Sequence, residues 1–470
     1  MKKIIITTCV AFALGACSSA NQVTSPTNSQ INLITEKSTT GLPKNIIMIV
    51  GDGMGPAYTT AYRYFNDDPS TPEIETTVFD RNLVGMSSTY PANVSGFVTD
   101  SAASATALAT GVKSYNGAIG LDVNKKPVQS VLEWAKLQNK KTGVVVTSQV
   151  NHATPASYLA HNESRRNYNA IADSYIDDGI KADIIFGGGW KYFIREDRNL
   201  VTEFTDAGFN YIDNYPALNS LPKNQSVLGL FADVGLPWAL DDSNQLRLST
   251  MTKAAIRQLE NPKGFFMLVE ASQIDWAGHS NDIASAMAEM HDLAKTVEYL
   301  EDYVQTNPDT LVILTADHST GGMTIAANGV YEWNPEVLRI MKHSPFHIAK
   351  KLAKVDITDN VVNELFNFSL STEELAQLRE TKKVTLKESL VFAGASEAKQ
   401  KTMPKPNVDK NLYKAIKKLI DKRTNTGWTS SGHTAVDVPV FAFGQNSERF
   451  NGKLDNTDIA KLIFTLQGKK

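Results

Sequence analysis

The sequence predicts an α/β fold, a three-layer α/β/α arrangement around a mostly parallel central sheet, with a largely helical insertion ahead of His433. Short continuous apolar runs alternate with amphipathic helical stretches, and such runs are typical of parallel strands covered on both faces. Residues 331–425 break this alternation, which predicts the insertion. With 470 residues, 42% of them hydrophobic, the chain can bury a substantial core. The expected strands are Ile46–Val50, Gly143–Thr147, Phe265–Val269, Leu311–Thr315 and Val438–Phe443.

Residues 1–17 are typical of an export signal. Lys2 and Lys3 precede an apolar run, Ile4–Leu14, that is too short to span a bilayer. The next residues complete Leu14-Gly15-Ala16-Cys17, which resembles a bacterial lipobox whose cysteine receives a lipid. An ordinary signal peptide cleaved a few residues later is the alternative. We therefore expect an exported protein, either anchored to the membrane through Cys17 and facing the bacterial periplasm, or secreted.

Composition predicts how the chain is divided into segments and which partners it lacks. Residues 18–43 are mostly polar and predict a flexible tether, whereas 44–330 and 426–470 form the predicted core around the insertion at 331–425. The 47 basic and 50 acidic side chains give a net charge of -3, so we expect no nucleic-acid binding. Cys9 would leave with the signal, so no intramolecular disulfide is expected.

Helical patterns place further elements. Ser344-Pro345 and the capping-box-like Ser371-Thr372-Glu373-Glu374 predict helix starts inside the insertion, which ends with a Lys-rich stretch at 410–423. Thr99 to Thr110 reads as a compact helix of small residues that ends at Gly111. A stripe at helical spacing predicts one helix packed on the sheet, through Ile283, Met287, Met290, Ala294, Val297 and Val304.

Metal-type ligands follow four of the predicted strands. Asp52 comes after the first run, His152 and Thr154 after the second, Glu270 directly after the third, and Asp317-His318 after the fourth. A single such residue is more often a turn former or a helix cap. Four together favour a site at the carboxyl edge of the sheet, where open α/β sheets assemble their binding sites.

Four further side chains carry candidate chemistry. Asp275 and His279 stand four residues apart, so on a helix they share one face and can hold one ion; the alternative is a surface ion pair. Ser101 lies at a helix start, where backbone N–H groups favour an anion, although an N-cap serine without catalytic role is the plainer interpretation. Arg165 offers a planar fork for phosphate oxygens, or is a surface arginine.

Taken together, these motifs resemble those of bacterial alkaline phosphatases, and they run in family order from residue 46 to about 443. The Asp-Ser-Ala-Ala-Ser-Ala-Thr-Ala stretch is the most specific of them. The long span from His318 to His433 resembles members with a large insertion that forms a crown or dimer contact, which implies a homodimer. The motifs are Asp52-Gly53-Met54-Gly55, 100–107, His152-Ala153-Thr154-Pro155-Ala156, 270–279, Thr315-Ala316-Asp317-His318 and Ser431-Gly432-His433-Thr434.

The resemblance implies two Zn²⁺ and one Mg²⁺ per chain, with Ser101 as nucleophile and Arg165 as the phosphate clamp. Two positions depart from one branch of the family, which has Asp and Lys where this chain has His152 and Trp276; the chain resembles another branch, which carries His and Trp there. Because imidazole suits Zn²⁺ or Co²⁺ better than Mg²⁺, these positions bear on the identity of the third metal. The implied ligands are Asp275, His279 and His433 for the first zinc; Asp52, Asp317, His318 and Ser101 for the second; and Asp52, Thr154 and Glu270, with His152 nearby, for the third.

The implied activity is the hydrolysis of small phosphate monoesters through a phosphoserine on Ser101. A phosphodiesterase or a sulfatase on the same scaffold is the enzymatic alternative, but Ser101-Ala102-Ala103-Ser104-Ala105 lacks the Cys/Ser-x-Pro-x-Arg context of sulfatases. An exported metal- or phosphate-binding lipoprotein without catalysis is the alternative from another class, because ligands alone do not establish chemistry.

Overall fold

The computed structural model describes residues 41–469. The predicted export signal, Cys17 and most of the tether predicted for 18–43 lie outside these residues. Within 41–469, no helix combines the length and the apolar character that crossing a membrane requires.

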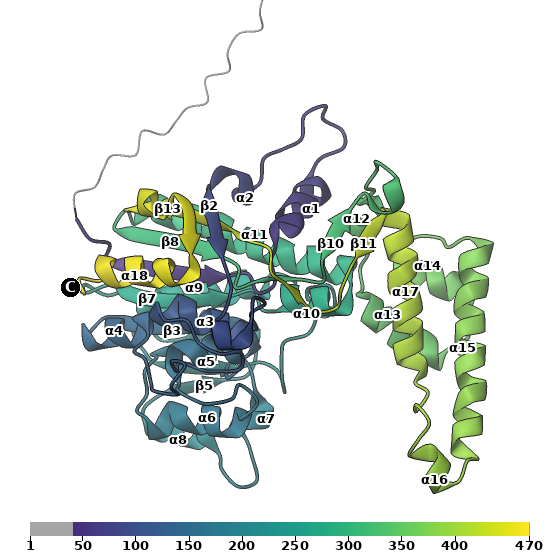
Figure 1. Ribbon diagram of the computed structural model, residues 1–470, viewed down its shortest axis with the longest axis horizontal. Helices are drawn as coiled ribbons and strands as arrows, with labels where there is room; N and C mark the ends of the chain where they lie inside the picture. The colour runs from purple at the N-terminus through teal and green to yellow at the C-terminus, as the bar shows by residue number, and fades with distance from the viewer. Residues whose placement is uncertain (1–40, 470) are drawn as a thin grey trace, which may run out of the picture. The chain divides into compact units, whose positions relative to one another are not determined.

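A sheet of ten strands forms the centre of the described chain (Figure 1). Seven of its neighbouring pairs are parallel and the two pairs made by one strand are antiparallel, so the predicted mostly parallel sheet is confirmed. In spatial order the strands are β14 (Gly452–Asp455), β2 (Leu83–Ser88), β13 (Val438–Gly444), β8 (Thr310–Thr315), β1 (Asn45–Val50), β7 (Phe265–Glu270), β3 (Lys141–Gln149), β4 (Ile184–Gly188), β6 (Val227–Leu230) and β5 (Asn210–Ile212).

The expectation that Val438–Phe443 is a parallel strand is wrong. This run forms β13, which pairs antiparallel with both β8 and β2. Strand β13 is apolar on both faces because it lies inside the sheet, where Val438 and Val440 are fully buried. A continuous apolar run reports burial on two faces and carries no information about strand direction.

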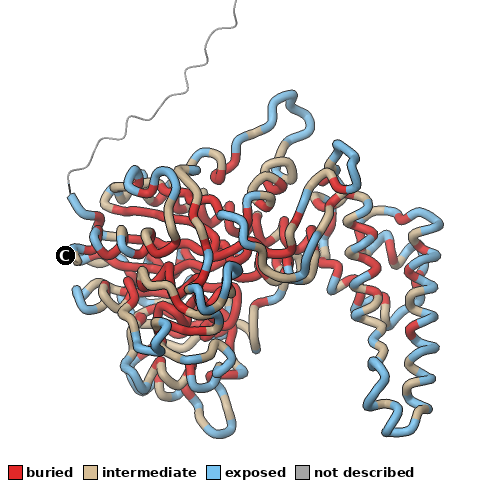
Figure 2. The backbone as a smooth tube through the Cα atoms, viewed as in Figure 1, coloured by how far each residue is buried: buried red, intermediate tan, exposed pale blue. Residues whose placement is uncertain are grey.

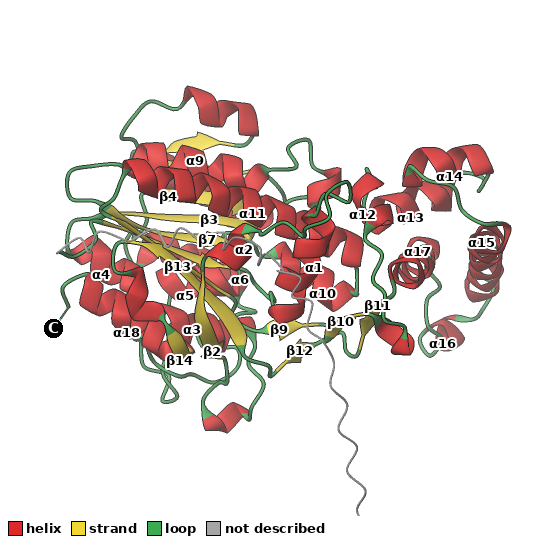
Figure 3. Cartoon of the chain, turned by 90° about the horizontal axis from the view of Figure 1, so that it is seen from above, coloured by secondary structure: helices red, strands yellow, loops and turns green. Residues whose placement is uncertain are grey.

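Helices cover both faces of the sheet, as Figure 3 shows. Alternate side chains of β1 enter opposite cores: Ile47 and Ile49 pack on one side, and Ile46, Met48 and Val50 on the other. The first side carries α1 (Pro56–Asn66), α2 (Val78–Arg81), α9 (Arg247–Leu259), α10 (Gln273–Ser280) and α11 (Ile283–Thr306). The second carries α3 (Ser101–Thr110), α4 (Val131–Leu137), α5 (Ala153–Leu159), α6 (Tyr168–Asp177), α7 (Trp190–Phe193), α8 (Leu200–Asp206) and α18 (Asn456–Leu466).

The insertion is helical, as predicted. Figure 2 shows that its outer helices are largely exposed, whereas the sheet is buried. Ser344 and Ser371 cap their helices through the side-chain oxygen, as their sequence context predicts. Its helices are α12 (Glu336–Ile340), α13 (Pro345–Lys354), α14 (Asp359–Phe366), α15 (Thr372–Ala393), α16 (Glu397–Gln400) and α17 (Val408–Thr424).

Two short antiparallel pairs join the base of the insertion to the carboxyl edge of the sheet. Strand β10 (Met323–Ile325) pairs with β11 (Thr426–Trp428), and β9 (Ser319–Thr320) pairs with β12 (His433–Thr434). Because each pair joins the chain before the insertion to the chain after it, the insertion leaves and returns at one place. Short 3₁₀ turns occupy Asn93–Ser95 (η1), Tyr215–Ser220 (η2), Ala239–Asp241 (η3), Ala327–Gly329 (η4) and Ser447–Phe450 (η5).

Candidate active site

Four adjacent strands bring their carboxyl ends to one edge of the sheet, in the order β8, β1, β7 and β3. The register sets Val50 beside both Thr315 and Glu270, so that Asp52 and Asp317 each follow two residues past an aligned pair. Strand β3 runs on to Gln149, and His152 comes three residues later. The predicted convergence of the ligands at this edge is therefore what the structure shows.

Asp275, His279 and His433 form the first group of ligands. Their ligand atoms lie within 4.8 Å of one another. Nε2 of His279 is 3.3 Å from Asp275 Oδ2, and Nε2 of His433 is 3.6 Å from Asp275 Oδ1. Helix α10 supplies the first two residues one turn apart, and the pairing of β12 with β9 supplies His433. Backbone carbonyls of Ser431 and Thr99 lie 2.6 and 2.9 Å from the Nδ1 atoms of His279 and His433, which orients both rings.

Asp52, Asp317 and His318 form the second group, and all three side chains are fully buried. Nε2 of His318 lies 3.1 Å from Asp317 Oδ2, 3.5 Å from Asp52 Oδ1 and 3.1 Å from Ser101 Oγ. The rings of His318 and His433 stack with centroids 3.5 Å apart, so the first two groups adjoin. The structure therefore places the predicted nucleophile directly against this second group.

Asp52 also belongs to the third group, with His152 and Glu270. Thr154, on α5, is fully buried and its Oγ1 makes no hydrogen bond within residues 41–469. The ring of His152 meets the ring of Trp276 edge to face, with centroids 5.9 Å apart. The two positions that depart from one branch of the family are thus neighbours beside this group.

The ligand groups contain buried oxygens that lack hydrogen bonds within the described part of the chain. These are both carboxylate oxygens of Asp52, Oδ2 of Asp317, Oε1 of Glu270 and Oγ1 of Thr154. Leaving one buried polar atom unpaired costs about 1–3 kcal/mol. Five such oxygens around one point are explained by bound cations, and the mixture of carboxylates and imidazoles suits Zn²⁺ and Mg²⁺.

Burial shifts the protonation of these groups in the absence of ions. It raises the pKa of Asp52 well above its ordinary value and that of Glu270 to about 7. It lowers the pKa of His152 to about 3 and that of His433 to about 4. A bound cation offsets the cost of burying ionised carboxylates, because its positive charge favours their ionised form. The same cation binds imidazoles in their neutral form.

Ser101 is the first residue of α3, and Asp100 is the cap of that helix. The interpretation of Ser101 as an N-cap serine is therefore wrong, because Asp100 Oδ1 accepts the Ala103 N–H at 3.0 Å in its place. Arg165 donates from Nη1 to Asp100 Oδ2 and lies 3.2 Å from His152 Nε2 through Nη2. The Arg165 side chain is only 20% exposed, so Arg165 is not a fully exposed surface arginine.

Gly53 is required by the close packing of this edge. Its φ is +74°, and a Cβ at this position would lie 2.7 Å from the Asp275 Cα. Its N–H donates to Asp317 Oδ1 at 3.1 Å, which orients that carboxylate. The glycine lets the loop after β1 pass between the first and second ligand groups.

The family profile for alkaline phosphatase matches residues 43–468. The chain belongs to the alkaline phosphatase family. This membership confirms the predicted class of enzyme, a phosphatase, and with the ligand groups it supports metal binding. The roles predicted for the individual site residues stay predictions.

Curated relatives and solved structures of the family resemble the chain over most of its length. Alkaline phosphatase 4 of Bacillus subtilis is 46% identical over 90% of this chain and 88% of its own. A cold-active alkaline phosphatase from a psychrophilic Shewanella is 49% identical over 90% of this chain and 99% of its own, with a TM-score of 0.81. A TAB5 alkaline phosphatase carrying a histidine-to-glutamate substitution, solved with Mg bound in its M3 site, is 26% identical over 91% and 99%, with a TM-score of 0.65.

Three supporting residues of this phosphatase site escaped sequence reasoning. Thr320 donates to Asp275 Oδ1 at 2.6 Å and contacts His318 Nδ1 at 3.2 Å, so it joins the first and second groups. Ser148 donates to Glu270 Oε2, and Ser272 donates to Ser148. Hydroxyl residues are common throughout the chain, and only their position beside a ligand marks them as supports.

Proposed function

We propose that the chain hydrolyses small phosphate monoesters through a phosphoserine on Ser101, at a site that holds two Zn²⁺ and a third cation. The observation that carries this proposal is the position of Ser101 Oγ, 3.1 Å from His318 Nε2, at the start of a helix and beside the buried carboxylates of the second ligand group. A protein that only stored metal or phosphate would have no need of a hydroxyl there.

The three cations would be held by the ligands that the family resemblance implies. Asp275, His279 and His433 would hold one Zn²⁺, and Asp52, Asp317, His318 and Ser101 the other. Asp52, Thr154 and Glu270 would hold the third cation beside His152. When bound, these ions would supply Lewis-acid stabilisation of the phosphoryl oxygens and would lower the pKa of the serine hydroxyl.

The residues of the chain then act as follows. Ser101 Oγ attacks phosphorus in line with the ester oxygen, so the Oγ–P bond forms as the P–O bond to the alcohol breaks. The leaving alkoxide takes up a proton and departs as the alcohol. Water then attacks the phosphoserine, which releases inorganic phosphate and restores the hydroxyl of Ser101. Two in-line displacements predict net retention of configuration at phosphorus.

Arg165 would bind the oxygens that do not react. Its planar guanidinium can donate two parallel hydrogen bonds to a phosphoryl group. Asp100 and His152 contact it from the protein side at 3.2 Å each, so the fork is oriented before substrate arrives. Ser101 opens α3, and the N-terminal end of a helix favours an anion.

We propose that His152 weakens the preference of the third site for Mg²⁺. Imidazole is a softer ligand than carboxylate and suits Zn²⁺ or Co²⁺. The TAB5 variant described above supports this proposal, because it holds Mg in its M3 site when a glutamate replaces a histidine.

We also propose, from the sequence, that the protein is exported, that Cys17 is acylated and that the chain forms a homodimer. Mass spectrometry of membrane fractions would reveal the lipid, and light scattering the dimer.

The decisive experiment is the substitution Ser101→Ala. Turnover of an aryl phosphate should fall by at least about 10³-fold, with Zn²⁺ content retained, and acid quenching with labelled phosphate should trap no phosphoserine. Ser157→Ala is the matched control, because it removes another buried helical hydroxyl, one that donates 2.9 Å to the Ala153 carbonyl. Full activity of Ser101→Ala would refute the proposal, and faster cleavage of a diester or sulfate ester than of a monoester would favour the alternative enzymes.

A further inference from the structure

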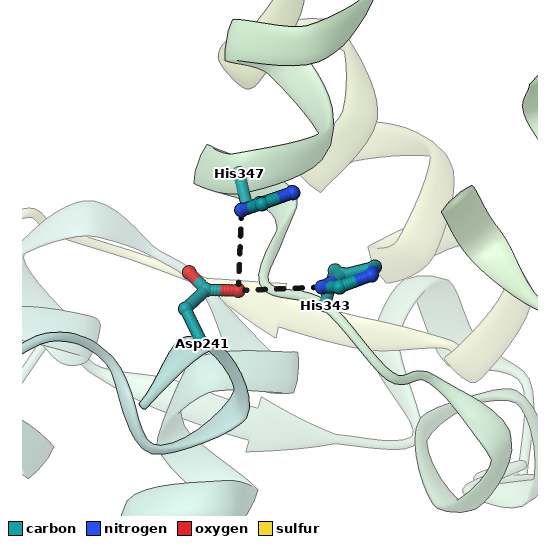
Figure 4. A group of neighbouring side chains, drawn as sticks. All are labelled: Asp241, His343 and His347. Atoms are coloured by element: carbon teal, nitrogen blue, oxygen red, sulfur yellow. Dashed lines mark ion pairs between the residues drawn. The ribbon is translucent and has the colours of Figure 1, made fainter. Parts of the chain in front are cut away.

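A second group of metal-type side chains lies outside the candidate active site. Asp241, at the end of η3, faces His343 and His347 from the start of the insertion (Figure 4). Both imidazoles turn Nδ1 toward the same carboxylate oxygen, Oδ1, at 3.9 and 4.0 Å. The two rings lie almost parallel, 10° apart, with centroids separated by 4.3 Å.

We propose that these three residues bind a transition-metal cation, Zn²⁺ by its chemistry, with water completing the coordination. Two imidazoles and one carboxylate are the ligand set of many four-coordinate zinc sites that keep one open position. Within residues 41–469, this is the one group of three such ligands that shares no residue with the active-site groups. The site is additional to the three cations of the proposed function and does not depend on them.

The distances leave room for a cation between the three side chains. A hydrogen bond between imidazole and carboxylate would need about 2.7–3.2 Å, and neither histidine comes that close to Asp241. Ligands held about 2.0–2.1 Å from a tetrahedral Zn²⁺ lie roughly 3.3 Å from one another. Each Nδ1 atom would therefore need to approach Oδ1 by about 0.6–0.7 Å, and the two parallel rings would turn toward the ion as it binds.

Hydrogen bonds of Ser344 position two of the three ligands, Asp241 and His347. Ser344 donates its N–H to Asp241 Oδ1 at 2.9 Å and its hydroxyl to Oδ2 at 2.5 Å. The same hydroxyl oxygen accepts the His347 N–H at 3.1 Å and caps α13. Ser344 is fully buried. One buried serine thus fixes the carboxylate between two histidines that lie four residues apart, one before the helix and one in its first turn.

Exposure and charge are compatible with metal entry. The side chains of His343 and His347 are 37% and 32% exposed, so an ion can reach them from solvent. Nζ of Lys350, a residue that lines the same cavity as Asp241 and His347, lies 4.4 Å over the ring of Phe346.

The position of the site gives it a structural consequence. Asp241 belongs to the segment before α9, whereas both histidines belong to the insertion, so a bound ion would join the two. Asp241 and His347 also line a cavity with Trp276 and Ser280, residues of the helix that carries Asp275 and His279. Occupancy would therefore brace the wall of this cavity from the insertion side.

The test compares metal content in the full chain. Wild type and the double variant His343→Gln/His347→Gln are stripped with chelator, refilled with Zn²⁺, desalted and analysed by native mass spectrometry and elemental analysis. The double variant should bind one Zn²⁺ fewer per chain, keep its aryl-phosphatase activity within about twofold, and lose part of the rise in Tm that Zn²⁺ gives wild type. Equal zinc content in the two proteins would overturn the proposal.

Two further variants keep the result decisive. His161→Gln is the matched control, because His161 lies 3.1 Å from a single carboxylate, that of Glu133, and should lose no zinc. Asp241→Asn retains an oxygen that accepts from Ser344 but removes the charge, so it should lower zinc affinity at least tenfold even if the double variant folds poorly. An Asp241→Asn chain with wild-type zinc affinity, or a His161→Gln chain that also loses one ion, would contradict the assignment.

Discussion

Asp100 holds the phosphate clamp and the helix of the nucleophile with one carboxylate. Its Oδ2 accepts from Nη1 of Arg165 at 3.2 Å, while its Oδ1 accepts the N–H groups of Ala103 and Gly117 at 3.0 Å each. The first of these N–H groups belongs to the opening turn of α3, which begins at Ser101. The Asp100 side chain therefore positions both the Arg165 guanidinium and the helix that begins with Ser101, the two groups that would act on one phosphoryl group.

Substitution of Asp100 should separate these two effects. Asp100→Ala should raise the inhibition constant of inorganic phosphate about tenfold, because Arg165 loses its partner, and should destabilise the chain by about 1 kcal/mol through loss of the cap. Asp100→Asn keeps an oxygen that can cap the helix, so it should weaken phosphate binding with little loss of stability. Phosphate inhibition and chemical denaturation measure the two quantities. Unchanged phosphate inhibition in both variants would show that Asp100 does not position the clamp.

Replacement of His152 should change the third cation. His152→Asp puts a carboxylate beside Asp52 and Glu270, so the affinity for Mg²⁺ should rise about tenfold and activity should become dependent on added Mg²⁺. His152→Asn removes the imidazole without adding charge and is the control. Activity is measured against Mg²⁺ concentration at constant Zn²⁺. A His152→Asp chain that responds to Mg²⁺ no more than His152→Asn would show that this position does not tune the site.

Chelation should destabilise the chain as well as inactivate it. The carboxylates of Asp52, Glu270, Asp275 and Asp317 are buried together, where the charge of a bound cation stabilises their ionised forms. Each ion bound at a thousandfold excess over its Kd stabilises the fold by about 4 kcal/mol, so Tm should fall markedly in chelator and recover with Zn²⁺ and Mg²⁺. The same scan on His343→Gln/His347→Gln isolates the active-site ions. A Tm that chelator leaves unchanged would mean that these sites bind no metal.

Asp421 should make the stability of the insertion fall with rising pH. Burial raises the pKa of Asp421 to about 7, although Trp428 Nε1 donates to its Oδ1 at 3.0 Å. Because the folded pKa lies above the unfolded value near 4, the stabilising contribution is complete below pH 4 and is lost as pH rises toward 7.

The substitution Asp421→Asn removes this titration and keeps an acceptor for Trp428. It should stabilise the chain above pH 7 by about 1–2 kcal/mol, less than three pKa units imply, because the side chain is partly exposed. Denaturation of wild type and Asp421→Asn is compared at pH 5 and pH 8. A gain of the same size at both pH values would assign the effect to packing and leave the titration of Asp421 without a role.

Local pattern accounts for much of what could be predicted from the sequence. The helix Ser101–Thr110 depends on small residues and on Gly111, which caps it, and the capped starts at Ser344 and Ser371 depend on contacts within one turn. The position of Asp52 and Glu270 at strand ends follows from apolar runs that stop beside them. The antiparallel direction of β13 could not be predicted from local pattern, because it depends on pairing with β8 and β2, which are distant in the chain.

The sequence by itself determined the layered class of fold, the ligand-bearing strand ends and the family, since each depends on residues that are near neighbours in the chain or stand in a family motif. Tertiary structure alone decided how distant segments meet: the pairing of β12 with β9 sets His433 beside Thr320, and the base of the insertion closes through β10 and β11. It also brought Asp241 to His343 and His347, about a hundred residues away. Such contacts depend on register and packing between segments, and local spacing carries no information about either.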